Sequence, residues 1–300
     1  MAELVHIKNG SLEASIDPMG AQLMSLALDG AEYLWQGDPA HWARRAPVLF
    51  PIVGCLRNDH AVSAEGEVSL KRHGIARLFE HRVVAQGDAS VTFELRSSAE
   101  TRAAFPYDFC LNMTYAVADG VLSQTYKVTN TGSVDLPFTL GGHPAFNVPV
   151  PGAAGTDGTT EGFSDYELRF AEPWTARVPR IDTDGLHDFS HMTTLFEGAD
   201  RLPLTHELID RLLTLVFCEV PGRTVTLLGT RSGHGVQVDF DGFDYLGVWT
   251  SDATAPFVAV EPWCGCATAY DESDVFEEKR GIITLAPGES CERTFTMRPF

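Results

Sequence analysis

The stretch "LNMTYAVADGVLSQTYKVTNTG", residues 111–132, decides the fold class of this 300-residue chain. In its two halves, 111–117 and 121–132, apolar or aromatic residues alternate with polar ones, as in a strand that is buried on one face. The intervening Ala-Asp-Gly, 118–120, is typical of a tight turn. Two alternating runs one turn apart predict a pair of antiparallel strands.

The same pattern recurs along the chain on both sides of this pair. Alternating runs occur at 11–18, 90–98, 224–230, 235–240, 245–251 and 281–300. Turn sequences such as "VPGR", "RSGHG" and "APGES" separate several of them. We therefore predict an all-β fold, built as a large antiparallel sandwich or barrel.

Helix signals are few, and nothing divides the chain into separate units. Residues 98–106 could hold one helical turn that begins at Ser98, and residues 271–281 at best a short helix. The Gly- and Thr-rich segment 150–165 is predicted to be a long surface loop. Strands of one kind flank this loop, so a single domain spanning 1–300 is expected.

Composition and charge exclude several classes of function. A formal net charge of −19 disfavours nucleic acid and anionic membranes as partners. No apolar run approaches the roughly 18 residues of a membrane span, and the first 15 residues lack a signal-peptide pattern, so we expect a cytoplasmic protein. The six cysteines are expected to be free thiols, and the unpaired Cys264-x-Cys266 is not expected to bind a metal.

One carboxylate stands out in "APFVAVEPWCG", residues 255–265. Glu261 follows an apolar run and precedes Pro262 and Trp263, so we interpret it as lying where a buried strand ends, with Pro262 and Trp263 in the turn that follows. A carboxylate at such a position either caps backbone donors or takes part in chemistry.

Two histidines are the next candidates. His143 in "FTLGGHPAFNVP" follows two glycines and precedes Pro144, which favours an extended backbone and a fixed imidazole that could act as a general acid. His73 lies in "KRHGIAR". The alternative for His143 is a hydrogen-bonded core histidine, and for His73 an ordinary polar turn.

Two further side chains could contact a ligand. Arg57, in the polar turn Arg57-Asn58-Asp59, could donate to a sugar hydroxyl or belong to a solvated turn. Trp249 could stack on a ligand ring or form part of the core. His187 and His191 are four residues apart, but the segment has no helical periodicity, so we do not interpret them as a metal pair.

Taken together, six segments resemble the aldose 1-epimerase (galactose mutarotase-like) family, in particular its LacX-like branch. In order, they are "GAQLMSLALDGAEYLWQGDPAHW", "PVLFPIVGCLRND", "KRHGIAR", "LGGHPAFNVP", "LGVWTSDATAPFVAVEPWCG" and "LAPGES". The resemblance implies an antiparallel β-supersandwich and the interconversion of the α and β anomers of an aldose, without cofactor or metal. The implied partner is a small-molecule sugar, and we expect the chain to be a monomer or a homodimer.

The resemblance also implies roles for individual residues. Glu261 matches the general base of the family, His143 its general acid, and His73 a histidine that holds the sugar near the ring oxygen. Arg57 and Asn58 fall in a loop that supplies sugar-contacting groups.

Two positions depart from the family pattern. Cys55 stands where the family has an arginine, and Leu212 where many relatives have an aspartate. The nearby Asp210 is the candidate substitute for that aspartate, the alternative being that the contact is lost, and Arg57 is the candidate for the arginine.

The chemistry requires one group to take the anomeric proton while another gives a proton to the ring oxygen. We expect Glu261 and His143 on either flank of that C–O–C unit, with an ordinary Glu pKa near 4.3 and a His pKa slightly above 6.5. The acidic chain favours a free hexose. Arg44, Arg45, Arg57, Lys71, Arg72 and Arg77 could bind a phosphate, so a hexose-6-phosphate 1-epimerase is an alternative. Others are a catalytically silent carbohydrate-binding protein and a lyase or hydrolase on the same scaffold.

Overall fold

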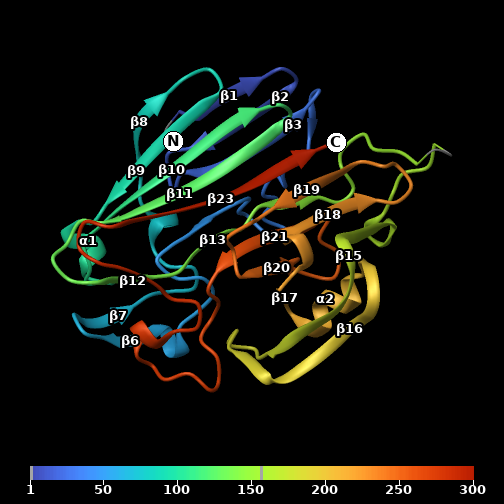
Figure 1. The fold of residues 1–300 in the computed structure, drawn as a ribbon. Helices are drawn as coiled ribbons and strands as arrows, with labels where there is room; N and C mark the ends of the chain where they lie inside the picture. The colour runs from blue at the N-terminus through green and yellow to red at the C-terminus, as the bar shows by residue number, and fades with distance from the viewer. Residues whose placement is uncertain (1–2, 156–157) are drawn as a thin grey trace.

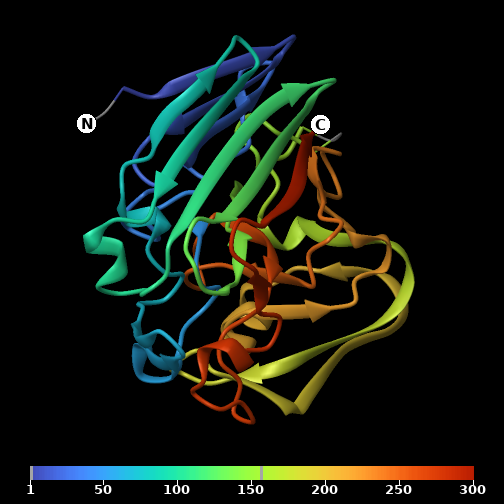
Figure 2. The ribbon, with the colours of Figure 1, turned by 60° about the vertical axis from the view of Figure 1, so that its left-hand side comes forward.

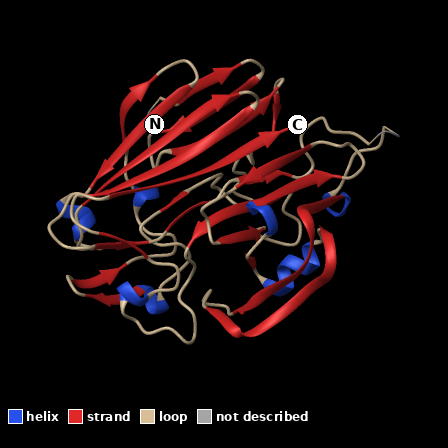
Figure 3. Cartoon of the chain, viewed as in Figure 1, coloured by secondary structure: helices blue, strands red, loops and turns tan. Residues whose placement is uncertain are grey.

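A computed structural model of the chain describes residues 3–155 and 158–300. Its backbone is dominated by antiparallel strands in two facing layers (Figures 1 and 3). One layer is a nine-stranded sheet in the order β16-β15-β18-β19-β23-β11-β10-β9-β8. Its strands, in chain order, are β8 (Arg82–Gln86), β9 (Ser90–Arg96), β10 (Phe109–Ala118), β11 (Val121–Asn130), β15 (Tyr166–Ile181), β16 (His187–Pro203), β18 (Thr224–Gly229), β19 (Gly235–Asp239) and β23 (Ser290–Pro299).

The facing layer contains a four-stranded and a six-stranded sheet. The four-stranded sheet, in the order β1-β2-β3-β4, packs against β9, β10 and β11. The six-stranded sheet has the order β17-β20-β21-β13-β5, with β14 also paired to β21. These strands are β1 (Val5–Asn9), β2 (Leu12–Asp17), β3 (Gln22–Leu28), β4 (Ala31–Glu32), β5 (Val48–Leu49), β13 (Leu140–Gly142), β14 (Ala145–Asn147), β17 (Leu215–Cys218), β20 (Tyr245–Trp249) and β21 (Phe257–Cys264).

Short elements complete the fold. Two small ribbons pair β6 (His60–Ser63) with β7 (Gly66–Ser69), and β12 (Leu136–Phe138) with β22 (Ile283–Leu285). The helices are α1 (Ala99–Arg102) and α2 (His206–Leu212), and 3₁₀ turns occupy Arg57–Asp59, Ala76–Leu78, Phe163–Asp165, Pro221–Arg223 and Phe276–Glu278.

The predicted central hairpin is β10–β11. Its register runs from Phe109 opposite Asn130 to Ala118 opposite Val121, and burial alternates along both strands. One large apolar cluster draws buried side chains from Val5 to Met297 and fills the space between the layers. The fold is therefore the antiparallel β-sandwich that the alternating pattern predicts.

Several local predictions are also confirmed. A helical turn begins after Ser98, whose side chain accepts a hydrogen bond from the Thr101 N–H. Segment 271–281 contains only the turn Phe276–Glu278. Within 150–165, residues 156–157 lie outside the described residues, and most of the remainder is loop.

Two features differ from the sequence-based interpretation. The first is the long pair β15–β16, which curls around one side of the molecule (Figure 2) and contains repeated register shifts. The second is β21, which does not end at Glu261. Pro262 and Trp263 lie within the strand, paired with Leu246 and Tyr245 of β20, and all eight residues of β21 are buried.

Candidate active site

A break between two short strands brings His143 beside Glu261. Both β13 and β14 pair with β21, Gly141 opposite Trp263 and Ala145 opposite Ala259. The register is the same on both sides of the break, so its continuation places His143 opposite Glu261. Val260 N–H donates to the Pro144 carbonyl within the gap. The region lies at the centre of the six-stranded sheet (Figure 1).

The two side chains are close together and almost fully buried. His143 Nε2 lies 3.3 Å from Glu261 Oε2. Their exposed fractions are 6% and 1%. Neither this Oε2 nor His143 Nδ1 has a hydrogen-bond partner, although both atoms are buried. Buried polar atoms are nearly always paired, so these two are available to a ligand.

Both residues line a cavity of about 370 Å³. This volume suits a small molecule. The wall is assembled from segments that span residues 42 to 267. Its aromatic, charged and imidazole side chains are Trp42, Arg44, Arg72, His73, Arg77, His143, His187, Trp249, Glu261 and Trp263.

Aromatic rings frame the imidazole of His143. Trp42 stacks on it with ring centroids 5.0 Å apart, and Trp249 meets it edge-on at 5.5 Å. The ring of His73 is perpendicular to that of His143 at 5.4 Å. Rotation of the His143 ring is therefore restricted on several sides, which fixes the direction of its nitrogens.

His73 has a defined backbone and tautomer. Its φ is +67°, in the left-handed region, and Gly74 follows at +69°. A Cβ on Gly74 would meet the Phe50 carbonyl oxygen at 2.4 Å, so only glycine fits there. Gly54 N–H donates to His73 Nδ1 at 3.2 Å, which places the ring proton on Nε2. His73 thus contributes a hydrogen-bond donor to the cavity.

Burial moves the two central pKa values in opposite directions. It raises the pKa of Glu261 well above its ordinary value, and nearby Arg72 only partly offsets this. The Trp263 indole N–H also lies near Glu261, but without hydrogen-bonding geometry. Burial, with smaller contributions from the charges of Arg77 and Arg72, lowers the pKa of His143 to about 3. The expected ordinary Glu and slightly raised His are therefore wrong, because both charges lose solvation.

These shifts favour the uncharged form of both groups, with the titratable proton on Glu261. The ionised arrangement, with the proton on His143, contains the same number of protons and requires only a transfer across the 3.3 Å contact. A ligand hydroxyl that donates to Glu261 favours the carboxylate and hence that transfer. The pair can therefore supply one base and one acid without exchanging protons with solvent. The two groups are immediate neighbours, whereas the sequence-based expectation placed them on separate flanks.

Arg57 and Asn58 lie outside the cavity lining. Arg57 Nη1 forms an ion pair with Asp274, and Nη2 donates to the Ala269 carbonyl at 2.9 Å. Asn58 is exposed, with φ of +56°. The structure thus gives Arg57 a role in tying the Arg57–Asp59 turn to the loop before β22, and the assignment of these residues to sugar binding is not retained.

Cys55, Leu212 and Asp210, the positions at which the chain departs from the family pattern, do not line the main cavity either. Cys55 is buried, its thiol 3.3 Å from the Asp184 carbonyl. Asp210 on α2 lines an adjoining cavity of about 190 Å³. The two cavities share Arg72, Ile181, Gly185, Thr214 and Trp249. Leu212 packs against the core, and Thr214, two residues further along, reaches the main cavity.

Sequence reasoning missed Trp42 and His187 as cavity residues. Trp42 closes the first segment of the family resemblance, which implies no role for it, and it precedes two arginines in "HWARRAP". His187 is 3% exposed at the start of β16, and its Nδ1 has no partner. Neither residue has a local pattern that separates it from an ordinary core residue.

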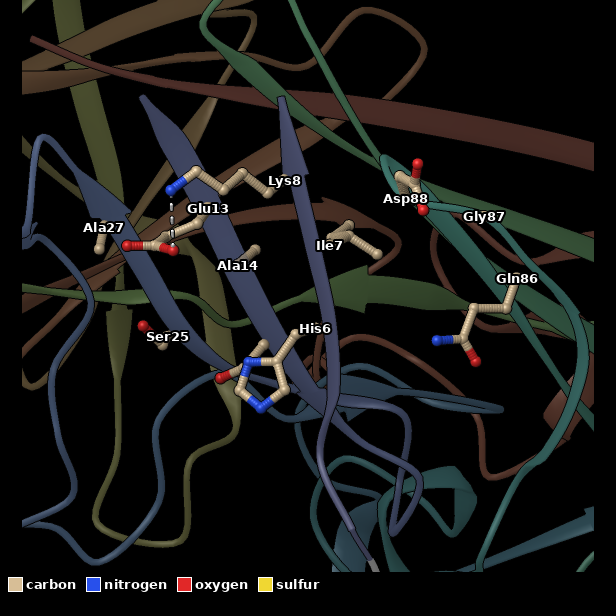
Figure 4. A pocket seen from close by; sticks show the side chains of 11 residues that line it. His6, Ile7, Lys8, Glu13, Ala14, Ser25, Ala27, Gln86, Gly87 and Asp88 are labelled. Carbon is tan, nitrogen blue, oxygen red and sulfur yellow. Dashed lines mark hydrogen bonds and ion pairs between the residues drawn. The ribbon is translucent and has the colours of Figure 1, made fainter. Parts of the chain in front are cut away.

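A larger hollow lies elsewhere, over β1–β3 and the β8–β9 turn (Figure 4). Its volume is about 950 Å³, and it also contains a histidine and acids. There, Lys8 and Glu13 point toward each other and pair at 3.5 Å, and His6, Lys8 and Glu13 are exposed. Exposed, mutually paired charges do not provide buried reactive groups, so the smaller cavity is the better candidate.

Two kinds of feature are absent from the described residues, 3–155 and 158–300. No cluster of three or more His, Cys, Asp or Glu side chains has the spacing of a metal site. No helix within these ranges has the length and apolarity needed to cross a bilayer.

Comparison with known proteins places this geometry in context. The family model described as aldose 1-epimerase matches residues 3–298. The chain is 33% identical over 299 residues to the plasmid-encoded protein LacX of Lactococcus lactis subsp. lactis, covering 97% of each chain.

Solved structures agree with this match. A galactose mutarotase-like protein from Lactobacillus casei superposes with a TM-score of 0.88 at 32% identity, covering 99% of this chain and 100% of the other. A galactose mutarotase related enzyme from Lactobacillus acidophilus gives 0.89 at 28% identity, covering 99% and 97%. A galactose 1-epimerase from Lactobacillus acidophilus gives 0.72 at 15% identity, covering 99% and 94%, which indicates a shared fold.

Proposed function

Because the chain belongs to the aldose 1-epimerase family, we propose that it interconverts the α and β anomers of an aldohexose by opening and reclosing the pyranose ring. One observation carries the proposal: a carboxyl and an imidazole lie 3.3 Å apart, buried in the wall of a cavity of about 370 Å³. Acid–base chemistry on a hemiacetal needs these two groups and no cofactor.

The proposed mechanism uses the pair as a unit. The anomeric hydroxyl oxygen and the ring oxygen are both bonded to C1, so two neighbouring side chains can reach both. Glu261 takes the anomeric proton while His143 gives a proton to the ring oxygen, the C1–ring oxygen bond breaks, and an aldehyde forms. Rotation about C1–C2 followed by the reverse transfers gives the other anomer. Each positioned proton transfer contributes about 10²- to 10⁴-fold.

The rest of the wall suits a sugar. Trp42 and Trp249, at an edge-on centroid distance of 5.3 Å, offer aromatic surface to the C–H face of a pyranose. The Nε2–H of His73 is a donor for the ring oxygen or a hydroxyl. These contacts would hold the ring so that C1 lies beside the Glu261–His143 pair.

Exchange NMR on equilibrated glucose, galactose and glucose 6-phosphate in phosphate-free buffer tests the proposal. The wild-type protein should accelerate α–β exchange of at least one of these aldoses well above buffer. His143→Asn should remove most of that acceleration. Binding of an aldose without any acceleration would instead identify a carbohydrate-binding protein and contradict the enzymatic proposal.

A second substrate class is favoured by a specific feature of the cavity. The net charge of −19 favours a neutral hexose, the free sugar of the sequence-based prediction. Three arginines nevertheless line the cavity that contains the Glu261–His143 pair. A cationic wall inside an acidic protein favours an aldose that carries negative charge.

A further inference from the structure

Six basic side chains are possible phosphate ligands on sequence grounds, and only some of them line the cavity. Arg45, Arg57 and Lys71 lie outside its lining and interact with other groups. Arg45 Nη1 donates to the Met24 carbonyl at 2.6 Å, Arg57 pairs with Asp274, and Lys71 pairs with Asp59 at 2.6 Å. Arg44, Arg72 and Arg77 line the cavity together.

No carboxylate neutralises these three guanidinium groups. Among the described residues, none of them has an Asp or Glu oxygen within ion-pairing distance, although nine other arginines of the chain do. Glu261 is the only carboxylate in the described lining, and burial raises its pKa, which favours its uncharged form. The positive charge of the wall is therefore uncompensated.

Backbone carbonyls nevertheless hold two of the arginines in place. Arg72 Nη2 donates to the Asp184 carbonyl at 3.1 Å, beside Gly185, where an added Cβ would lie 2.6 Å from the same nitrogen. Arg77 Nη2 donates to the Arg72 carbonyl at 2.7 Å, and Arg77 Nε is buried without a partner. Neutral acceptors orient these groups while leaving their charge and further N–H donors for a ligand.

The three charges converge on the proposed reaction centre. After burial and the effect of His143, Arg77, Arg72 and Arg44 all act to lower the pKa of His73. Arg44 and Arg72 likewise lower the pKa of Arg77 beyond the effect of burial. Because the three arginines affect the pKa of His73, and two of them that of the third, all three guanidinium groups lie close together around the cavity.

We infer that the substrate is an anionic aldose, and that Arg44, Arg72 and Arg77 bind its phosphate or carboxylate group while C1 lies at the Glu261–His143 pair. The inference rests on the proposed epimerase function. Guanidinium groups form charge-assisted, bidentate hydrogen bonds with such anions.

The adjoining cavity is not the site of the anion. It is lined by Asp182, Asp210 and Asp252, with Arg72 as its only basic residue in the described lining. Arg44 and Arg77 line the main cavity and do not line the adjoining one. The anionic group is thus bound in the main cavity, and the adjoining acids repel it from the other.

Exchange NMR with matched sugars tests the inference. Rates for glucose, glucose 6-phosphate and glucuronate are compared in phosphate-free buffer. We expect kcat/KM for the better of the two anionic sugars to exceed that for glucose by about tenfold or more, since one hydrogen bond to a charged group alone can account for that factor. Preference for glucose 6-phosphate identifies a phosphate site, and preference for glucuronate a carboxylate site.

Single substitutions identify the groups responsible. Arg72→Gln, Arg77→Gln and Arg44→Gln should each lower the ratio of anionic to neutral kcat/KM by about tenfold. Arg44 is exposed and has no hydrogen bond in the described structure, so its replacement leaves the fold intact even where Arg72 or Arg77 is needed for folding. Lys71→Gln removes the same charge next to Arg72 but outside the cavity, and should leave the ratio unchanged.

The failure of this inference differs from the failure of the proposed function. Glucose turned over at least as efficiently as both anionic sugars, or a ratio unaffected by the arginine substitutions, overturns the anionic substrate and leaves the epimerase. Absence of acceleration for all three sugars overturns the epimerase itself and the inference with it.

Discussion

At the scale of single residues, the Glu261–His143 contact determines what the cavity can do. A buried carboxyl lies 3.3 Å from a buried imidazole, and burial disfavours the charged form of both groups. In the proposed reaction the sugar completes the site, because its hydroxyl groups supply hydrogen bonds that the ionised pair lacks.

Glu261→Gln separates the chemical role of this carboxyl from its structural role. We expect kcat to fall about 10²- to 10⁴-fold while KM stays within about threefold, because the amide keeps the shape and loses the base. Stability at pH 7 should be unchanged or higher, since Gln has no ionised form to bury and the pKa of Glu261 is raised by burial. Exchange NMR and thermal unfolding measure the two effects.

Glu161→Gln is the matched control. Burial raises the pKa of Glu161, but hydrogen bonds from Ser232 and from the Arg231 and Ser232 N–H groups outweigh it and lower the pKa overall. This substitution should therefore destabilise the protein without changing kcat. Near-normal turnover in Glu261→Gln would place the base elsewhere.

His73→Asn tests the proposed donor at the ring oxygen. Asparagine tolerates the left-handed backbone of position 73, where φ is +67°, so the local fold should survive. We expect KM to rise and kcat to fall, each by about tenfold, because both the ground state and the transition state lose a hydrogen bond. Steady-state exchange rates at several sugar concentrations give both constants. Unchanged constants in a folded variant would make His73 a structural residue.

At the scale of elements, the site depends on the register of β21 with its neighbours. Gly247 of β20 lies opposite Glu261, and the Trp263 ring covers it. A Cβ on Gly247 would lie 2.4 Å from Trp263 Cζ2, closer than packing allows. Position 247 of β20, opposite Glu261, therefore requires glycine, even though larger residues generally favour strands more than glycine does.

Gly247→Ala should consequently disturb the fold and the site together. We expect a loss of about 1–3 kcal/mol in the free energy of unfolding from overpacking, with reduced turnover as Trp263 shifts. Urea unfolding and exchange NMR provide the measurements. Gly87→Ala is the control, because the nearest atom to its Cβ is 4.0 Å away and its φ is not positive. Equal stability of the two variants would show that Trp263 moves without cost.

Strands with regular alternation could be predicted from the sequence, and irregular ones could not. The hairpin β10–β11 alternates in burial because one face packs on the core. In β15 the register shifts and two prolines interrupt the period, so no window has a clear pattern. The sequence misplaces the end of β21 because proline is rare inside a central strand, whereas Pro262 lies within β21, beside the gap between β13 and β14.

The site was predictable only as far as residue type and order allow. Glu261, His143 and His73 meet in one cavity, as the resemblance implies, and Trp249, a candidate from its residue type, also lines it. Which arginines join them depends on where distant partners such as Asp274 and the Met24 carbonyl lie, and no local pattern encodes that. The pKa shifts likewise follow from burial by the whole fold.

At the scale of the whole molecule, four histidines link folding to pH. Burial lowers the pKa of His81 to about 4 and those of His143 and His187 to about 3, and it also lowers the pKa of His73 well below the ordinary value. An unfolded histidine titrates near 6.5. Between about pH 6.5 and 4 the unfolded chain therefore binds more protons at these positions, and stability falls as the pH falls. Glu261 acts in the opposite direction, because its raised pKa makes the folded state bind a proton above about pH 4.5.

The net difference of roughly three protons, four histidines against Glu261, predicts a steep acid limb. At about 1.4 kcal/mol per pH unit and proton, the free energy of unfolding should drop by several kcal/mol between pH 6.5 and 5, a range above the titration of ordinary carboxyl groups. Urea unfolding at about pH 5.0, 5.5, 6.0 and 6.5 measures how steeply the free energy of unfolding changes with pH. His81→Gln, whose amide can still donate to the Ala76 carbonyl, should flatten it by about one proton. A slope of zero, or greater stability at pH 5 than at 6.5, would mean that these histidines are already charged in the fold.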